Sequence, residues 1–154
     1  SGFQRDRFRR VHEQLAQFYR GRWDEQQHHV PVTLDARPKV VRRKERPPHM
    51  GEIPNSTYTS IDGGPRLRRS VLQIRSCHGR AIHPTEKPVE LLQLPIEYSC
   101  PADGVVLDPF AGSGSTLEAA LLCGRAAIGI EVNEADCEQA ARRLEQGRAE
   151  ARFA

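Results

Sequence analysis

Apolar positions in the second half of the chain form two short runs separated by a longer apolar segment. Residues 105–108 and 126–131 are apolar runs that each end on an acid, which predicts two strands. Residues 115–123 lie between them and stop at Gly124, as expected of a helix with a glycine after its last turn. This strand–turn–helix–strand order predicts an α/β fold with a Rossmann-like sheet.

Two further helices are predicted on either side of this unit. Residues 89–99 predict a helix in which Thr85 is the expected N-cap and Pro88 occupies the first turn. Pro95 lies inside this segment, where an internal proline is expected to kink a helix. Asn133 is the expected cap of a long final helix whose first turn is acidic.

The first half of the chain is poorer in apolar runs. Residues 3–14 predict a short polar helix, and residues 15–19 and 71–74 predict two strands. Residues 31–66 carry repeated prolines and the pair Gly63-Gly64, so we expect them to be irregular. An irregular segment of this length in a compact domain is usually functional or disordered.

The turn after residues 105–108 carries the first candidate chemistry. Gly112 and Gly114 let the backbone approach a ligand, and the helix behind them presents free N–H groups. A P-loop is excluded because no Gly-Lys-Ser/Thr follows. A dinucleotide site is disfavoured because Leu117 stands at the third glycine position and Asp108 would repel a pyrophosphate. An ordinary glycine turn without a ligand is the competing interpretation.

An acid at the end of the first strand suits a cation better than a phosphate. S-adenosylmethionine has an ammonium and a sulfonium to face Asp108, a carboxylate for the N–H groups, and a ribose diol. A ribose-binding acid is expected about 20 residues past the glycines, and Glu131 stands at that separation from Gly112. The pattern therefore predicts S-adenosylmethionine as the cofactor and implies no metal.

A second motif makes this pattern more specific. The chain reads His-Pro-Thr-Glu-Lys-Pro over residues 83–88, Leu-Asp-Pro-Phe-Ala-Gly-Ser-Gly over residues 107–114 and Gly-Ile-Glu over residues 129–131. This order resembles the DNA amino-methyltransferases, the N6-adenine and N4-cytosine enzymes, in their permuted beta-type arrangement, where the cofactor motifs come last. The resemblance is close over residues 83–144 and looser towards the N-terminus. It implies part of the S-adenosylmethionine-dependent methyltransferase fold with an irregular basic insert, and methylation of an exocyclic base amine in DNA.

The resemblance also implies a role for the matched positions. Residues of the glycine turn would line the methionine end of the cofactor, Thr85 and Lys87 would flank its carboxylate, and Glu131 would take the ribose. Ser115 departs from the threonine usual in the family, but it keeps a hydroxyl. The implied cofactor-binding residues are Thr85, Lys87, Asp108, Pro109, Phe110, Gly112, Ser113, Gly114 and Glu131.

The family's catalytic tetrapeptide, Asp/Asn/Ser-Pro-Pro-Tyr/Phe, does not occur in the 154 residues. In the family its polar residue holds the exocyclic amine, and its ring stacks on the flipped base. Residues 108–110 lack the second proline and belong to the cofactor turn. In the permuted order the tetrapeptide would precede every motif present. We therefore expect the chain to be the C-terminal portion of a methyltransferase, inactive alone, with no catalytic residue of its own.

Charge divides the chain in two. Residues 1–80 carry 17 basic and 8 acidic side chains, whereas residues 81–154 carry 6 and 12. A basic block favours a polyanion partner, and a merely solvated basic face is the competing interpretation. The resemblance assigns residues 1–80 to the end of the catalytic half with a target-recognition segment, and residues 81–154 to the cofactor-binding part. The side chains expected to contact phosphates of double-stranded DNA are Arg42, Arg43, Lys44, Arg46, Arg66, Arg68 and Arg69.

The four cysteines indicate neither a metal site nor a disulfide framework. They form no Cys-x-x-Cys pair and suggest reduced thiols in a cytoplasmic protein. No signal peptide or membrane-spanning run is recognisable in the sequence. Three alternatives stay open: a non-catalytic DNA- or cofactor-binding remnant, a nicotinamide oxidoreductase and an RNA methyltransferase. The sequence does not decide between adenine and cytosine, and it leaves the oligomeric state and a restriction–modification partner open.

Overall fold

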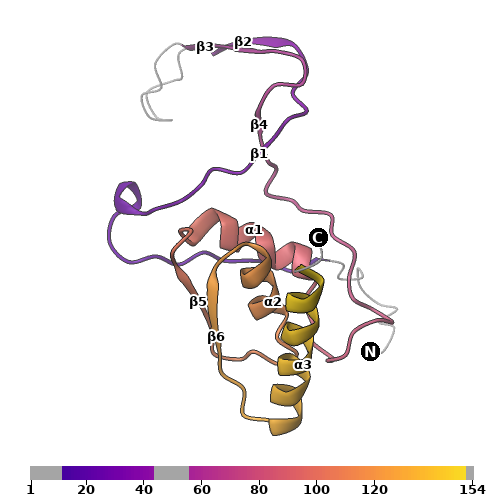
Figure 1. Ribbon diagram of the computed structural model, residues 1–154. Coiled ribbons are helices and arrows are strands. Elements are labelled where there is room, and N and C mark those ends of the chain that lie inside the picture. The colour runs from indigo at the N-terminus through magenta and orange to yellow at the C-terminus, as the bar shows by residue number, and fades with distance from the viewer. Residues whose placement is uncertain (1–11, 44–55, 152–154) are drawn as a thin grey trace, which may run out of the picture.

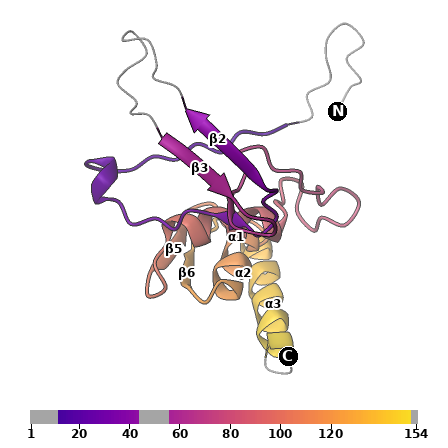
Figure 2. The same ribbon diagram turned by 90° about the horizontal axis from the view of Figure 1, so that it is seen from above.

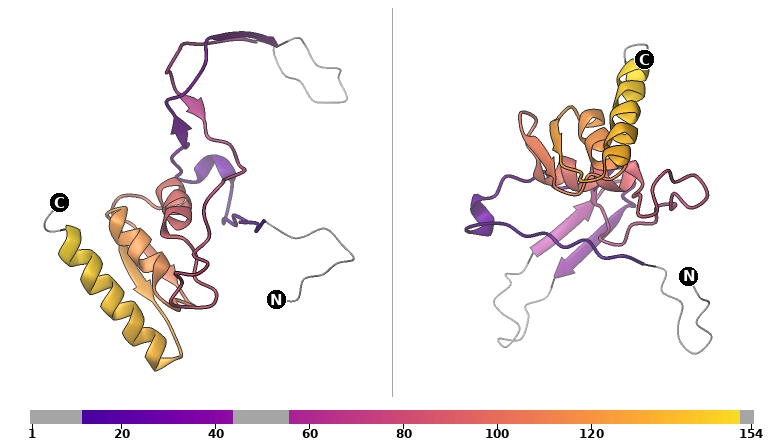
Figure 3. Two further views of the ribbon diagram at one scale, coloured as in Figure 1. Left: turned by 90° about the vertical axis from the view of Figure 1, so that its right-hand side faces the viewer. Right: turned by 90° about the horizontal axis from the view of Figure 1, so that it is seen from below.

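The computed structural model describes residues 12–43 and 56–151 of the 154-residue chain. Two parts can be followed in Figure 1. The first is an α/β body built from residues 89–151. The second is an extended β-arm, formed by residues 31–43 and 56–68, that leads away from the body (Figures 1 and 3).

The body is a β–α–β unit with one further helix before it and one after it. β5 (Val105–Asp108) and β6 (Ala126–Gly129) are parallel neighbours, and α2 (Ser115–Leu122) connects them. α1 (Val89–Ser99) precedes β5, and α3 (Glu134–Ala151) follows β6. The predicted α/β fold is confirmed, and the four elements predicted over residues 89–131 lie within two residues of the observed bounds.

The core lies between the two helices α1 and α2 and one face of the strand pair. Ile96, Ala119 and Ala120 are buried there, with Val106 and Ala127 packed against them from the strands. Alanines let α2 approach both neighbours closely, and burial of these apolar side chains is the main stabilising term. The opposite face of the strands is apolar and more than half exposed at Val105, Leu107 and Ile128.

The β-arm contains two antiparallel strand pairs. β1 (Val32–Thr33) pairs with β4 (Arg66–Leu67), and β2 (Lys39–Arg43) pairs with β3 (Ser56–Ser60). Figure 2 shows one of these pairs, labelled β2 and β3, from above. The arm is thus more regular than its prolines suggest. Pro31, Pro38 and Pro65 each stand just before a strand, where no ladder hydrogen bond is lost. The strands themselves are rich in valine, threonine and tyrosine, which favour extended backbone.

Several local predictions for the remaining segments were wrong. Residues 15–19 and 71–74 form no strand, because neither run has a paired neighbour among the described residues. The segment before β1 instead contains a short 3-10 helix, η1 (Trp23–Glu25). The helix predicted over residues 3–14 falls mostly outside the described residues, and its described end, residues 12–14, is not helical.

α1 also begins differently from the prediction. Pro88, not Thr85, is its N-cap residue, with extended backbone at φ −58° and ψ 131°. The helix then runs continuously through Pro95, so the proline does not end it. Asn133 caps α3 as predicted, because its Oδ1 accepts the Ala135 N–H at 3.0 Å. None of the helices in the described ranges is long and apolar enough to cross a membrane.

Candidate functional site

The glycine turn joins the carboxyl end of β5 to the start of α2. Gly112 and Gly114 have φ values of +49° and +77°, in the left-handed region that glycine adopts without strain. A Cβ placed on Gly114 would lie 2.9 Å from the Cβ of Ala140, so the turn also packs closely against α3. At the start of the turn, Asp108 Oδ1 accepts the Phe110 N–H at 3.0 Å. The glycine turn is therefore held closely between β5, α2 and α3.

Glu131 ties the end of the second strand to this turn. Its Oε2 accepts the Gly112 N–H at 2.8 Å, and its Oε1 accepts the N–H groups of Val132 at 2.8 Å and Asn133 at 3.0 Å. The bonds from Asn133 and Gly112 hold the pKa of the Glu131 carboxyl below its usual value. Since parallel strands end at the same edge of the sheet, the Glu131 carboxylate, two residues after β6, meets the turn that follows β5.

The segment before α1 folds over the same edge. The imidazole of His83 would be in van der Waals contact with a Cβ on Gly112, at 3.7 Å, so the ring lies directly beside the glycine turn. Thr85 Oγ1 lies 3.0 Å from His83 Nδ1. Lys87 Nζ donates to Glu13 Oε2 at 2.7 Å, so this ammonium is paired with the N-terminal segment.

Together these three segments line one pocket of about 370 Å³. Seven of the nine residues predicted to bind a cofactor border it: Thr85, Lys87, Asp108, Phe110, Gly112, Ser113 and Glu131. Pro109 and Gly114 shape the turn without bordering the pocket. A cofactor role for these residues stays a prediction, but the structure brings them from three separate stretches of sequence to one place.

The sequence interpretation omitted His83 and Glu86 from this pocket. Both belong to the motif over residues 83–88, so their position in that motif was the available signal. The lining combines the carboxylates of Glu86, Asp108 and Glu131 with the ammonium of Lys87. Such a lining suits a ligand that carries a cationic group and hydroxyls beside a smaller negative group.

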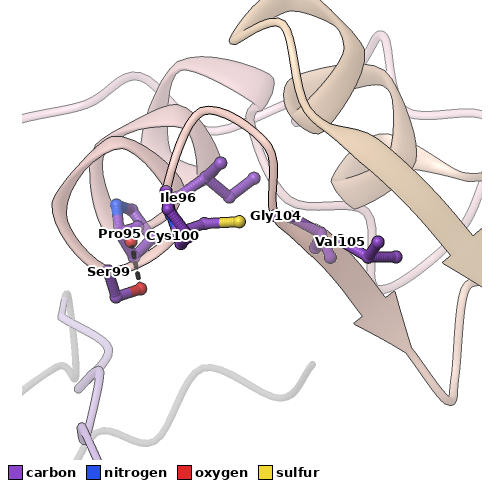
Figure 4. A pocket seen from close by; sticks show the side chains of 8 residues that line it. Pro95, Ile96, Ser99, Cys100, Gly104 and Val105 are labelled. Atoms are coloured by element: carbon purple, nitrogen blue, oxygen red, sulfur yellow. Dashed lines mark hydrogen bonds between the residues drawn. The ribbon is translucent and has the colours of Figure 1, made fainter. Parts of the chain in front are cut away.

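A second pocket, of about 360 Å³, lies between the end of α1 and the start of β5 (Figure 4). Pro95, Ile96, Cys100, Gly104 and Val105 line it, with the Ser99 hydroxyl bonded back to the Pro95 carbonyl at 2.6 Å. It is lined by no charged side chain. We therefore place the candidate cofactor site in the pocket at the ends of β5 and β6.

The residues predicted to bind DNA that the structure describes belong to the β-arm or follow it directly. Arg42 lies on β2, and Arg68 and Arg69 follow β4; all three side chains are exposed. Arg43 is the last residue of β2, opposite Ser56 in the register. Lys44 and Arg46 lie outside the described residues.

Arg66 differs from the other arginines of the arm because it has an acidic partner. Its Nη2 donates to Asp35 Oδ2 at 2.7 Å, across the β1–β4 pair. The Thr33 hydroxyl and the Arg66 charge lower the pKa of Asp35. A phosphate would have to compete with this carboxylate for Arg66, so Arg42, Arg68 and Arg69 are the better candidates for phosphate contacts.

Comparison with known proteins identifies the family of the chain. A family model described as DNA methylase, for N6 and N4 methyltransferases, matches residues 1–142. The chain is similar to the putative methylase YubD of Escherichia coli K12, with 59% identity over 56 residues, covering 36% of this chain and 25% of YubD. It is also similar to the type II methyltransferase M.ScaI of Streptomyces caespitosus, with 42% identity over 71 residues, covering 46% of this chain and 23% of M.ScaI.

A solved structure, the M1.HpyAVI–SAM complex, is 37% identical, with a TM-score of 0.41, and the match covers 42% of this chain and 32% of that one. The chain spans about a quarter of the length of the curated relatives it matches.

Proposed function

The chain belongs to the N6/N4 DNA methylase family, and on that premise we propose that it binds S-adenosylmethionine and serves methyl transfer to an exocyclic amine of adenine or cytosine in DNA. One observation carries this proposal. The glycine turn after Asp108, the segment over residues 83–87 and Glu131 come from separate stretches of sequence, and all three border one pocket.

The residues around this pocket fit the charges of S-adenosylmethionine. Asp108 would face the cationic end, since its Oδ1 is bonded to the Phe110 N–H and its Oδ2 has no hydrogen bond within the described residues. Glu131 would accept a ribose hydroxyl at Oε2, which in the part of the chain that the structure describes holds only the Gly112 N–H, because a carboxylate oxygen can accept two bonds. Thr85 and Lys87 would lie by the carboxylate. The cofactor would supply an electrophilic methyl group.

The same proposal assigns the β-arm to DNA. Its strand β2 presents Arg42 to solvent, and Arg68 and Arg69 follow the arm into the body. Exposed guanidinium groups bind phosphates without reading sequence, so these contacts would position the duplex. The proposed partner is double-stranded DNA.

The missing catalytic tetrapeptide limits what residues 1–154 can do by themselves. No Asp/Asn/Ser-Pro-Pro-Tyr/Phe occurs among them, so we propose that the isolated chain binds cofactor and DNA without transferring a methyl group. The same observation favours a second candidate function, a non-catalytic DNA- or cofactor-binding module.

Calorimetric titration of the folded chain tests the cofactor assignment. S-adenosylmethionine and NAD are titrated separately, with folding checked by circular dichroism. We expect saturable binding of S-adenosylmethionine and none of NAD, because Asp108 stands where a pyrophosphate would be repelled. Binding of NAD alone would support the oxidoreductase alternative, and a folded chain that binds neither would contradict the proposed site.

A further inference from the structure

Arg143 of α3 lies behind the cofactor pocket and contacts three of the elements that form it. Its Nη1 donates to Glu86 Oε1 at 2.9 Å, and its Nε donates to Glu118 Oε2. A longer bond, of 3.4 Å, joins Nη1 to the hydroxyl of Ser113. One guanidinium therefore bonds to the segment before α1, the first turn of α2 and the glycine turn.

The partners of Arg143 are themselves tied to the pocket walls. Glu86 Oε2 accepts the Ile82 N–H at 2.8 Å, which closes the segment over residues 82–86 into a loop. The Ser113 hydroxyl lies 3.3 Å from that of Ser115, and both residues are buried. Glu86 and Ser113 also border the pocket directly. Arg143 thus bridges the loop and the glycine turn.

The cluster of Arg143, Glu86 and Glu118 is largely shielded from solvent. Its hydrogen bonds therefore fix the relative positions of these side chains more firmly than exposed ion pairs would. The side chains of Arg143 and Glu86 are 18% and 7% exposed. Burial raises the pKa of Glu86, but the bonds from Arg143 and the Ile82 N–H outweigh it and keep the pKa below its usual value. A guanidinium presents several donors in a fixed planar geometry, which suits a group that must hold two carboxylates at once.

We propose that Arg143 is a positioning residue for the cofactor pocket, which holds the loop over residues 82–87 against the glycine turn through Glu86 and Ser113. This inference rests on the proposed function, because the pocket must first bind S-adenosylmethionine. Arg143 does not border the pocket, so its effect on the ligand is indirect.

The neighbouring arginine provides a matched control. Arg142 lies on the same helix and forms an ion pair with Glu138 at 3.2 Å, but its side chain is 74% exposed. Arg143→Lys keeps the charge and loses the forked geometry, whereas Arg143→Met removes both. We expect Arg143→Lys to weaken S-adenosylmethionine binding about tenfold or more, and Arg142→Met to leave it unchanged within twofold.

Two readouts separate positioning from general stability. Hydrogen exchange of the peptide spanning residues 82–88 should speed up in Arg143→Lys, under conditions where the thermal midpoint shows the protein to be folded. Neutralising the cluster with Arg143→Met, Glu86→Gln and Glu118→Gln should restore much of the stability lost in Arg143→Met, because no buried charge is left unpaired. We expect it not to restore affinity, since the directional bonds are gone.

The outcomes distinguish this inference from the proposed function. If the unaltered chain binds no S-adenosylmethionine, the proposed function fails. Faster exchange over residues 82–88 in Arg143→Lys would still show that Arg143 holds this loop in place. If the unaltered chain binds and Arg143→Lys binds equally well with unchanged exchange, the inference is overturned. Recovery of full affinity by the neutral triple variant would overturn it as well, because Arg143 would then serve only to balance charge.

Discussion

Asp108 is the residue proposed to face the cationic end of the cofactor. Asp108→Asn keeps the acceptor for the Phe110 N–H but removes the charge that would face a sulfonium or ammonium. We expect S-adenosylmethionine affinity to fall more than tenfold, or more than about 1.4 kcal/mol, and the same for Asp108→Ala. Calorimetry measures this, with Asp103→Asn, an exposed acid before β5, as the control. Equal affinity of the Asp108 and control variants would show that no cation lies there.

Glu131 should make stability depend on pH in a defined window. Its pKa is lowered on folding by the N–H groups of Asn133 and Gly112, from an ordinary value of 4.5. A carboxyl with a depressed folded pKa stabilises the protein above its unfolded pKa, and this stabilisation disappears as pH falls through the folded value. The thermal midpoint of Glu131→Gln should therefore lie below that of the parent at pH 7, and the difference should shrink below about pH 4.5.

Thermal scans of the parent and of Glu131→Gln, run in parallel at pH 7 and at pH 3, provide the measurement. A midpoint difference that stays constant from pH 7 to pH 3 would mean that the ionised carboxylate does not support the glycine turn.

Individual pocket residues could be predicted because the chain carries them in two compact motifs. Asp108, Gly112 and Glu131 stand at spacings that a β–α–β unit brings together, so their positions in the sequence were enough to predict that they lie at one site. The contact of Arg143 with Glu86 could not be predicted in this way, since 57 residues separate them. Helical spacing places Arg143, three residues after the buried Ala140, nearer the packed side of α3 than Arg142, but it does not identify the partners of Arg143.

The close packing of the glycine turn against α3 leads to a prediction about the free energy of unfolding. An alanine at Gly114 would be strained by its φ of +77°, and its Cβ would lie 2.9 Å from the Cβ of Ala140. Gly124 has a similar φ of +72° but nothing within 4 Å of an added Cβ. We expect Gly124→Ala to cost about 1–2 kcal/mol and Gly114→Ala to cost about 1–3 kcal/mol more from overpacking.

Urea unfolding of the two glycine variants measures the free-energy cost of the close contact between position 114 and α3. Gly124→Ala carries the backbone strain alone, so the difference between the variants reports the contact with α3. Equal losses of unfolding free energy would show that α3 can move away from the turn without cost.

The β-arm should account for much of the salt dependence of DNA binding. Each phosphate neutralised contributes about −0.9 to the slope of log affinity against log salt. Arg42→Ala and Arg43→Ala on β2, combined with Arg46→Ala outside the described residues, should therefore flatten the slope by roughly two to three units. Arg66→Ala should change it less, because Asp35 already pairs with that guanidinium. Fluorescence anisotropy with a mixed-sequence duplex measures both slopes. An unchanged slope in the triple variant would mean that these three arginines contact solvent and not phosphates.

The elements of the body could be predicted well, and those of the first half poorly. Gly124 marks the end of the apolar helix α2, and the cap residue Asn133 marks the start of α3. The strands β2 and β3 have mostly polar or charged residues, so their hydrophobic pattern is weak, and their pairing stabilises extended backbone instead. Residues 71–74 have the apolar pattern of a strand and no partner in the described chain, which shows that pattern alone does not make a sheet.

Charge and shape divide the whole molecule along the same line. The β-arm carries six basic and two acidic side chains, whereas residues 81–154, which include the body and its pocket, carry 6 basic and 12 acidic ones. Figure 1 shows these two parts of the fold. A polyanion would therefore be attracted to the arm and repelled from the body, which leaves the pocket to a cationic cofactor. This arrangement matches a protein that binds its two proposed ligands on separate surfaces.

Separate surfaces imply that binding and methyl transfer can be measured independently in this chain. We expect residues 1–154 to bind S-adenosylmethionine and duplex DNA and to transfer no methyl group, because no residue among them supplies the amine-holding and base-stacking groups of the family's tetrapeptide. A radiolabelled transfer assay on mixed-sequence DNA, run beside both binding measurements, tests this, with an active methyltransferase of the same family as the positive control. Incorporation of label by the purified chain would show that other side chains, the exposed Phe110 at the pocket first among them, hold and stack the flipped base.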